Sequence, residues 1–235
     1  PSIERVTACD PLGDGLSCVQ YVLHMGDDLF VINRGRVSVG KHSTTVTPWG
    51  TRFIQRMAAL HHWTPFAHPQ VTLRLRMPVF IAREWRTHSV GFIRSEESRR
   101  DVTSTPSIWL PTEWREAPDD DERVQHVRSS TRVHNGSERY TAKVSTLYGQ
   151  QIALYHHLID EGVAPELARG HLPQSMYVTF DETGSLAAYA RLCNLRIADD
   201  TQLETRRYAE AVESIIAPLF PLSWAALRGT IASAE

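Results

Sequence analysis

Hydrophobic positions along the chain recur with two different periods, and each period predicts one kind of element. Over residues 48–61 apolar side chains recur at helical spacing, which predicts an amphipathic helix carrying Phe53, Ile54, Met57 and Leu60 on one face. Over residues 71–77 apolar side chains alternate with Thr72, Arg74 and Arg76, which predicts a strand with one polar face. The longest helical pattern predicts a helix over about residues 140–162.

Shorter patterns predict the remaining elements. Residues 21–23 and 29–32 are two strand-like runs separated by a turn at residues 26–28, and a further strand is expected over 176–180. Helices are expected over 184–194 and 201–216, followed by a short helix next to Pro218 and Pro221. Residues 83–89 are expected to be helical, 94–100 to form a loop, and 102–140 to be irregular. Strands flanked by helices without strict alternation predict one α/β (α+β) domain over residues 1–235.

Composition narrows the class of protein. With 42% hydrophobic and 22% charged residues, the chain has the balance of a folded globular protein. A net charge of −2 disfavours nucleic-acid binding by the whole surface. We expect neither a leading signal segment nor a membrane span. We therefore expect a cytoplasmic location. Cys9, Cys18 and Cys193 are odd in number and lack metal-ligand spacing, so neither a disulfide framework nor a metal site is predicted.

Candidate chemistry concentrates in residues 83–100. Of the 25 basic residues only Lys41 and Lys143 are lysines, a bias that codon usage in a GC-rich genome explains at most positions. Arginine nevertheless binds carboxylate and phosphate bidentately, and this segment combines an arginine cluster with hydroxyls and His88. Spacing alone favours a solvated face of Arg–Glu pairs over an anion site. The chain has no GxSxG or GxGxxG motif, which disfavours a serine hydrolase and a Rossmann nucleotide site.

The same segment resembles the signature of the flavin-dependent thymidylate synthases. That family places Arg-Gln-Trp before Arg-His-Arg and then Asn-Glu-x-Ser-x-Arg-Tyr. Further blocks agree in order from about Gly26 to the C-terminus. The corresponding stretches here are Arg36-Val37-Ser38, Thr64-Pro65-Phe66-Ala67-His68, Arg83-Glu84-Trp85, Thr87-His88-Ser89, Ser95-Glu96-Glu97-Ser98-Arg99-Arg100, Ala168-Arg169 with Leu172-Pro173, Asn194-Leu195-Arg196 and Pro218-Leu219-Phe220-Pro221.

The resemblance implies a fold and a reaction. It implies a single domain with a central mixed sheet and long helices, assembled as a homotetramer with active sites shared between subunits. The implied reaction is reductive methylation of a pyrimidine nucleotide, UMP or dUMP, at C5. Methylenetetrahydrofolate supplies the carbon, NADPH reduces FAD, and reduced FAD supplies the hydride. Neither nucleic acid nor membrane is an expected partner.

The resemblance also implies roles for individual residues. Arg196 stands at the position of the arginine that contacts the pyrimidine ring and, with His88 and Ser98, forms the catalytic set. The implied substrate-binding residues are Glu84, Arg86, Glu96, Ser98, Arg99, Arg100, Arg169 and Arg196. The implied cofactor-binding residues are Ser38, Thr64, Thr87, His88, Ser89, Ser185 and Arg191.

Several positions depart from the family pattern. Thr87 and Ser89 replace two arginines of the triplet, Glu84 replaces a glutamine, and Ala67 replaces a glutamate. Removing a charge-assisted hydrogen bond costs about 1.5–3 kcal/mol unless another group replaces it. Arg83, Arg94 and Arg99 are the nearby candidates for that replacement. Change confined to the pocket favours altered substrate use over loss of function.

Four functions are therefore weighed. The leading hypothesis is a divergent C5-methyltransferase that accepts UMP, similar to the family branch acting in polyoxin-type nucleoside-antibiotic biosynthesis. The second is a thymidylate synthase specific for dUMP. The third is a non-catalytic nucleotide- or flavin-binding paralogue, favoured by the loss of arginine at Thr87 and Ser89. Nucleic-acid binding through the arginine cluster is the fourth and is disfavoured by the balanced charge.

Overall fold

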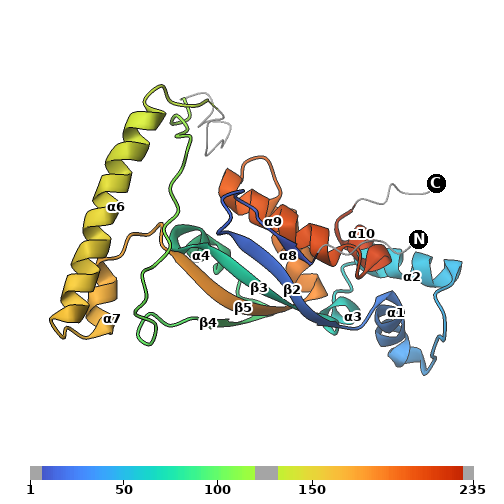
Figure 1. Cartoon of the computed structure of the whole chain (residues 1–235). Helices are drawn as coiled ribbons and strands as arrows, with labels where there is room; N and C mark the ends of the chain where they lie inside the picture. The colour runs from blue at the N-terminus through green and yellow to red at the C-terminus, as the bar shows by residue number, and fades with distance from the viewer. Residues whose placement is uncertain (1–6, 120–131, 230–235) are drawn as a thin grey trace.

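The computed structural model describes residues 7–119 and 132–229. In that part of the chain, strands and helices alternate irregularly (Figure 1), as expected for the α/β (α+β) class. The elements follow in the order β1 (Ala8–Cys9), β2 (Cys18–Met25), α1 (Asp28–Arg36), η1 (Val37–Val39), α2 (Pro48–Ala59), α3 (Thr64–Ala67), β3 (Gln70–Pro78), α4 (Val79–Trp85), β4 (Phe92–Glu96), α6 (Ser137–Asp160), α7 (Pro165–Ala168), η2 (Arg169–His171), β5 (Tyr177–Ser185), α8 (Leu186–Arg196), α9 (Leu203–Ile216) and α10 (Pro221–Leu227).

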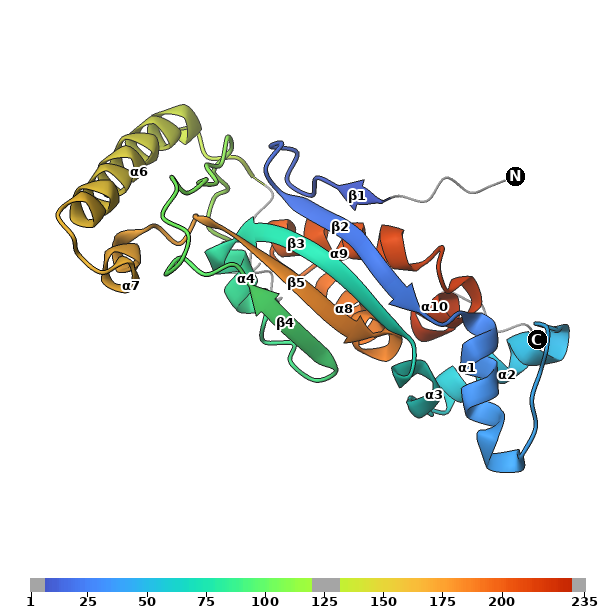
Figure 2. The same ribbon diagram turned by 60° about the horizontal axis from the view of Figure 1, so that its bottom comes forward.

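The described strands form one sheet in the order β1-β2-β3-β5-β4. Every pairing in it is antiparallel, so the expectation of a mixed sheet is wrong. The reason is the insertion of β5 between β3 and β4, against both of which it runs in the opposite direction (Figure 2). A strand that enters between two earlier strands in this way creates two antiparallel ladders.

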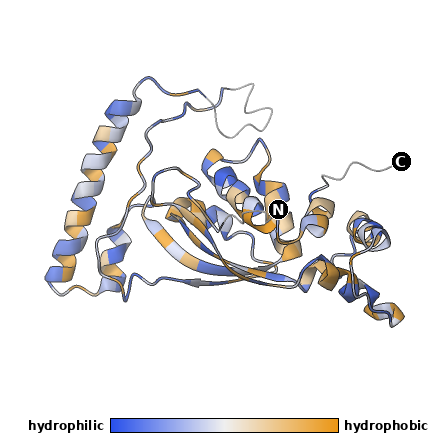
Figure 3. Cartoon of the chain, turned by 45° about the vertical axis from the view of Figure 1, so that its right-hand side comes forward, coloured by the Kyte–Doolittle hydropathy of each residue, from blue (hydrophilic) through white to orange (hydrophobic). Residues whose placement is uncertain are grey.

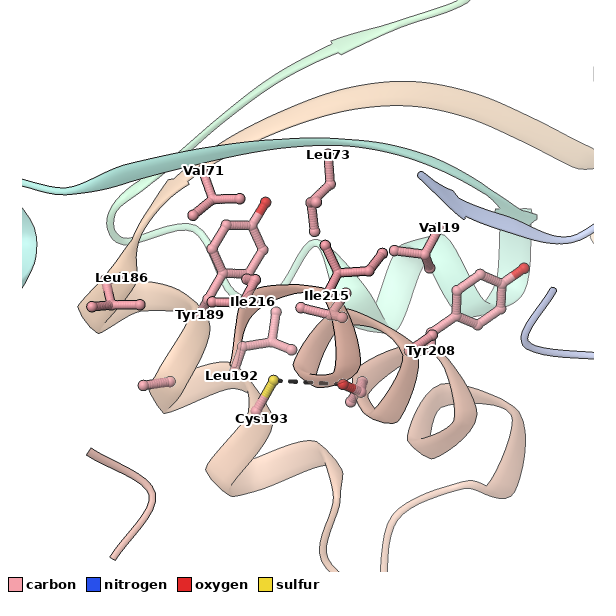
Figure 4. Close-up of a cluster of buried hydrophobic side chains, with 14 of the residues drawn as sticks. Val19, Val71, Leu73, Leu186, Tyr189, Leu192, Cys193, Tyr208, Ile215 and Ile216 are labelled. Carbon is pink, nitrogen blue, oxygen red and sulfur yellow. Dashed lines mark hydrogen bonds between the residues drawn. The ribbon is translucent and has the colours of Figure 1, made fainter. Parts of the chain in front are cut away.

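Helices α8 and α9 cover one face of this sheet and form the core with it (Figure 4). The predicted alternation in β3 is confirmed, because Val71, Leu73, Leu75 and Met77 are fully buried. Tyr189 of α8 packs in the same layer, and the Cys193 thiol donates to the carbonyl of Ala209 at 3.6 Å. The core therefore holds α8, which carries the candidate Arg196, firmly against the sheet.

Residues 29–32 are helical, so the expectation of a second strand there is wrong. They belong to α1, whose N-cap Asp27 accepts a hydrogen bond from the Phe30 amide at 2.7 Å. Asp28 accepts the amides of Leu222 and Ser223 at 2.9 and 2.8 Å, which fixes α1 to α10. The cap and this long-range contact outweigh the β propensity of Val31 and Ile32.

Residues 92–96 form the strand β4. No strand was expected there, and the expectation that residues 94–96 belong to a loop is wrong. Their ladder with β5 places Arg94 directly opposite Glu182 and Phe92 opposite Gly184. Phe92 packs edge-on against Tyr189 with 5.0 Å between the ring centroids. The pairing partner lies almost ninety residues away in sequence, so local patterns carry no signal for it.

The predicted long helix is confirmed as α6, which stands away from the sheet together with α7 (Figure 1). Apolar and polar residues are mixed along its length (Figure 3). Tyr155 is its buried residue, whereas Leu147 and Leu154 remain 51% and 43% exposed. The connection before α6 is irregular wherever it is described, and residues 120–131 of the predicted 102–140 segment lie outside the described residues. Among the helices described, none is both long and apolar enough to cross a bilayer.

Candidate functional site

The catalytic candidate Arg196 lies where the last turns of α4 and α8 meet. Its Nη1 donates to Glu84 Oε1 at 2.6 Å and its Nε donates to His88 Nε2 at 2.8 Å. The second oxygen of Glu84 accepts from the Thr205 hydroxyl of α9 at 2.8 Å. One segment, Glu84 to His88, thus holds the guanidinium directly, and Thr205 of α9 holds Glu84 in turn. The structure therefore brings the candidates Glu84, His88 and Arg196 together.

Local structure explains how α4 delivers Glu84 to this place. The helix begins directly after Pro78, and its first amides, those of Val79 and Phe80, donate to the carbonyls of Met176 and Gln174 just before β5. At its other end the Thr87 hydroxyl donates to the Glu84 carbonyl at 2.7 Å. Thr87 therefore satisfies a carbonyl of the last turn, in which Glu84 sits.

His88 is held in its neutral form. Burial lowers its pKa below the ordinary value of 6.5, and the neighbouring cations Arg196, Arg191 and Arg94 lower it further. Because Nε2 accepts a hydrogen bond from Arg196, the ring proton lies on Nδ1. A neutral imidazole can orient a cation without repelling it, which is the role that this geometry supports.

A hollow of about 560 Å³ opens beside Arg196. Its lining is mostly polar and comes from α4, α8, the segment after α8, and Arg115 of the long connection. Arg115 is itself bound through two hydrogen bonds of 2.7 and 2.8 Å to the buried carboxylate of Glu204. The complete lining is Glu84, Arg115, Leu195, Arg196, Asp200, Thr201 and Gln202. A small polar ligand that meets Arg196 has space here.

Two further hollows, of about 500 and 440 Å³, share Trp63 in their linings. Ser185 and Arg191 line the larger of the two, and Ser38 and Thr64 line the smaller. The larger is strongly apolar, with Val90, Phe92 and Ile93 among its lining residues. Four of the implied cofactor-binding residues therefore border two hollows that share Trp63 as a wall. Apolar walls with a few polar groups suit a flat aromatic ligand, so these residues fit a flavin.

Ser185 and Arg191, two of the implied cofactor-binding residues, also make hydrogen bonds that stabilise the fold. The Ser185 hydroxyl accepts the Ala188 amide at 3.2 Å and is the N-cap of α8. The Arg191 guanidinium donates to the Val90 carbonyl at 2.5 Å. Arg191 thereby ties α8 to the turn after His88. Ser89 is exposed in that turn, and its carbonyl accepts the Phe92 amide at 3.2 Å.

The other implied substrate-binding residues lie at the Glu96 end of β4 or beside α7, except Arg86, which directly follows α4. Arg86 and Glu96 form an ion pair with each other, and the Ser98 hydroxyl accepts the Arg100 amide at 3.2 Å. Arg100 approaches Glu166 of α7 at 3.4 Å, and the exposed Arg169 begins η2 directly after α7. Arg100 and Arg169 thus lie at α7, which stands apart from α8 and α9 in Figure 1, whereas Arg196 ends α8.

The three arginines nearest to the altered triplet make contacts within the chain. Arg83 donates to the Gln174 side chain at 3.3 Å. Arg94 pairs with Glu182 at 2.5 Å, and Arg99 donates to the Ser104 carbonyl at 2.6 Å. Each of them thus has a structural partner. Among the described residues, Arg191 is the arginine that lines the apolar hollow.

Sequence reasoning missed several residues that shape these hollows. Thr205 and Gln202 lie in a stretch that matches the family but carried no named role, and Arg115 lies in the irregular connection, where local spacing gives no sign of it. Glu182 did carry a signal, because it occupies a position of β5 that alternation assigns to the buried face. No group of three or more His, Cys, Asp or Glu residues suited to a metal ion occurs in residues 7–119 and 132–229.

The chain is similar to several known proteins. A flavin-dependent thymidylate synthase from Kosmotoga olearia is 30% identical over 208 residues, which cover 88% of each chain. The enzyme of the same name from Thermus thermophilus is 27% identical over 213 residues, covering 89% of this chain and 75% of the relative.

Among solved structures, the UMP/dUMP methylase PolB from Streptomyces cacaoi bound with 5-Br UMP superposes with a TM-score of 0.77. The two are 24% identical, and the match covers 90% of this chain and 93% of that one, which shows a shared fold. The family model described as thymidylate synthase complementing protein matches residues 20–222. The chain therefore belongs to the thymidylate synthase complementing protein family.

Proposed function

We propose that this protein is a flavin-dependent enzyme that methylates a pyrimidine nucleoside monophosphate, UMP or dUMP, at C5. One observation carries the proposal: the Arg196–His88 contact links a residue that lines the polar hollow to the turn that lines the apolar one. Arg196 lines the polar hollow, and two residues after His88 the chain lines the apolar hollow with Val90 and Gly91. A nucleotide in the first hollow and a flavin in the second would share this short wall.

Arg196 is the residue that acts on the pyrimidine in this proposal. Its guanidinium is fixed by Glu84 and His88, so it does not need to reorient when negative charge develops on the ring. A preorganised cation stabilises such charge more effectively than a mobile one. His88, held neutral, keeps the guanidinium in place without competing for the substrate as a second cation.

The FAD site is proposed over the two hollows on either side of Trp63. Ser38 and Thr64 border one part, Ser185 and Arg191 border the other, and apolar side chains cover the floor. When bound, FAD supplies the hydride, with NADPH as the reductant and methylenetetrahydrofolate as the carbon source. We assign to Arg191, which lines this region, the cationic role that the family's arginines hold at the positions of Thr87 and Ser89.

Phosphate recognition is proposed to involve a second copy of the chain. Arg100 and Arg169 suit a phosphate but lie on the α7 side, away from Arg196. A homotetramer would bring the α7 side of one subunit to the α8 side of another. The partly exposed Leu147 and Leu154 of α6 support this assembly, because an amphipathic helix that stands apart from its own sheet leaves apolar surface for a partner.

Glu84 supports acceptance of a ribose. Its two oxygens accept one hydrogen bond each, from Arg196 and Thr205, and a carboxylate oxygen has room for another donor. A sugar hydroxyl in the polar hollow could supply that donor. On this ground we propose that UMP is a substrate alongside dUMP, as in the branch that modifies nucleotides for nucleoside antibiotics.

A competition reaction tests the proposal. Purified protein receives equal UMP and dUMP with FAD, NADPH and methylenetetrahydrofolate, and mass spectrometry follows the methyl gain on each nucleotide. Methylation of UMP supports the full proposal, and methylation of dUMP alone limits the protein to thymidylate synthesis. Retention of flavin with no methylated product would contradict catalysis and favour a binding paralogue.

A further inference from the structure

A second polar network lies behind the proposed site and involves a carboxylate that the reaction itself does not use. Glu182 of β5 is fully buried, with 0% of its surface exposed. Its Oε2 accepts from Arg94 Nε at 2.5 Å, and both of its oxygens lie 3.2 Å from the Trp85 indole nitrogen, which donates to them. Glu182 and Arg94 face each other directly across the β4–β5 ladder.

The same arginine reaches onward to the active-site turn. Arg94 Nη2 donates to the carbonyl of His88 at 2.6 Å. The guanidinium thus bridges the buried carboxylate and the backbone of the residue whose ring meets Arg196. The Tyr189 hydroxyl donates to the Glu182 carbonyl at 3.2 Å and holds the strand at this point.

We propose that Glu182 is a positioning residue that acts through Arg94 on the backbone of His88 and thereby aims the His88 ring at Arg196. The inference rests on the proposed function, since it assigns to Arg196 the task described above. Glu182 does not contact the polar hollow. Its influence passes through one guanidinium to the His88 carbonyl, and from the imidazole to Arg196.

The energetics of burial favour this role over simple cross-strand pairing. Burial penalises a charged carboxylate and raises the pKa of Glu182, while Arg94 and Trp85 oppose that rise. A buried ion pair is often no more stabilising than apolar residues of the same size, so stability alone is a weak reason to place one here. The Arg94 guanidinium can stay directed at the His88 carbonyl only if an anion fixes its other side, and Glu182 is that anion.

The exposed Asp181–Arg74 pair can be compared with the buried Glu182–Arg94 pair. Asp181, one position earlier on β5, pairs with Arg74 of β3 through two hydrogen bonds of 2.8 and 3.0 Å. That pair also joins two neighbouring strands, but the side chains of Arg74 and Asp181 are 53% and 40% exposed, respectively. It is therefore a matched control for an Arg–carboxylate pair that holds strands together without reaching His88.

The test compares three variants of the full-length protein. Glu182→Gln keeps an oxygen for Trp85 but turns an amide donor toward Arg94, which releases the guanidinium. Arg94→Lys keeps the charge, but a single ammonium lacks the planar fork that bridges Glu182 and the His88 carbonyl. Asp181→Asn is the control. The thermal midpoint of each variant is recorded so that loss of folding is seen directly.

The first readout is the His88 imidazole, followed by ¹⁵N NMR over a pH titration and assigned with His88→Gln. The groups facing this ring are Arg196 and Arg191 of α8, Arg94 of β4 and Glu84 of α4. In the wild type we expect a ring protonated at Nδ1 with a depressed pKa. Glu182→Gln and Arg94→Lys should shift this pKa toward the ordinary value and populate the other tautomer, while Asp181→Asn should match the wild type.

The second readout is turnover. We expect the two buried-pair variants to lower kcat about 10- to 100-fold with a smaller change in KM, the size associated with misplacing a catalytic group. A His88 titration unchanged in a folded Glu182→Gln or Arg94→Lys protein would overturn the inference, as would an equal change in Asp181→Asn. If the wild type fails to methylate either nucleotide, the proposed function fails, but the NMR comparison still decides whether Glu182 positions His88.

Discussion

Arg196 Nε donates to His88 Nε2 at 2.8 Å, and this contact joins the end of α8 to the turn that follows α4. The donor is a permanent cation and the acceptor is a neutral imidazole, so the pair depends on His88 staying unprotonated. Glu84 takes the other side of the same guanidinium at 2.6 Å. The proposed catalytic cation is therefore oriented from two directions before any substrate arrives.

Replacing the central guanidinium should impair catalysis far more than folding. In Arg196→Lys the ammonium cannot bind Glu84 and His88 in one plane while facing the substrate. We expect kcat to fall about 10²- to 10³-fold, the range for loss of one preorganised electrostatic group. The thermal midpoint should change little, because Arg196 ends its helix and is part exposed. Arg207→Lys, at an exposed position of α9, is the control and should behave as wild type.

The pH dependence of turnover should contain one limb set by His88. Its pKa lies below the ordinary 6.5, so the ring is neutral near pH 7 and becomes charged only as the pH falls through that lowered value. Protonation removes the acceptor for Arg196 and places two cations side by side, so turnover should decline on the acid side. His88→Gln retains an acceptor that does not titrate and should lose this limb. An acid limb with an unchanged midpoint in His88→Gln would contradict the assignment.

Glu84 should influence the choice of sugar. Glu84→Gln restores the family's residue and removes the strong acceptor proposed for the ribose hydroxyl. We expect kcat/KM for UMP to fall relative to dUMP by about tenfold, which corresponds to one lost hydrogen bond to a charged group. Parallel steady-state assays on the two nucleotides measure the ratio. An unaltered ratio would remove Glu84 from the specificity argument while leaving Arg196 untouched.

The Arg115–Glu204 pair should stabilise the protein in a pH-dependent way. Burial raises the pKa of Glu204, but hydrogen bonds from Arg115 and Gln202 outweigh it, so the pKa lies below the ordinary 4.5. The stabilisation is therefore present above about pH 4.5 and is lost as the pH falls through the lower, folded-state pKa. Arg115→Gln should reduce the free energy of unfolding in urea by about 1.5–3 kcal/mol at pH 7.

That difference between Arg115→Gln and the wild type should shrink in acid, where Glu204 is protonated in both proteins. Arg74→Gln breaks an exposed pair, which solvent screens, and should leave the free energy of unfolding nearly unchanged at any pH, which makes it the reference. A constant difference across the pH range would show that Arg115 stabilises the fold by packing rather than through Glu204.

Gly184 should not tolerate a side chain. A Cβ at this position would lie 2.5 Å from the Phe92 ring and 2.9 Å from the Tyr189 ring. Because both rings pack against each other, Gly184→Ala should lower stability by about 1–3 kcal/mol and disturb the wall of the apolar hollow. Gly149→Ala in α6 meets no atom within 4 Å and should instead raise stability by about 0.5–1 kcal/mol. Thermal melts with opposite shifts would confirm both.

The periodic elements could be predicted because their signals are local. Apolar residues at helical spacing identify α2, α6 and α9, and the alternation of β3 identifies its buried face, since each pattern reflects which side of one element meets the core. The ordered motif blocks likewise pointed to the family before any contact was known. For the same reason Glu84, His88 and Arg196 could be named as candidates, though not as one cluster.

Other features were decided by tertiary structure. Residues 29–32 have strand-like composition, yet Asp27 and the bond from α10 to Asp28 make them helical. Strand β4 exists because β5 offers it a ladder, and the direction of β5 makes the sheet antiparallel. The pairing of Arg94 with Glu182, and of Arg196 with His88, spans some ninety or more residues. Local sequence specifies periodicity and caps, whereas such contacts depend on strand register and helix packing, which only the folded chain determines.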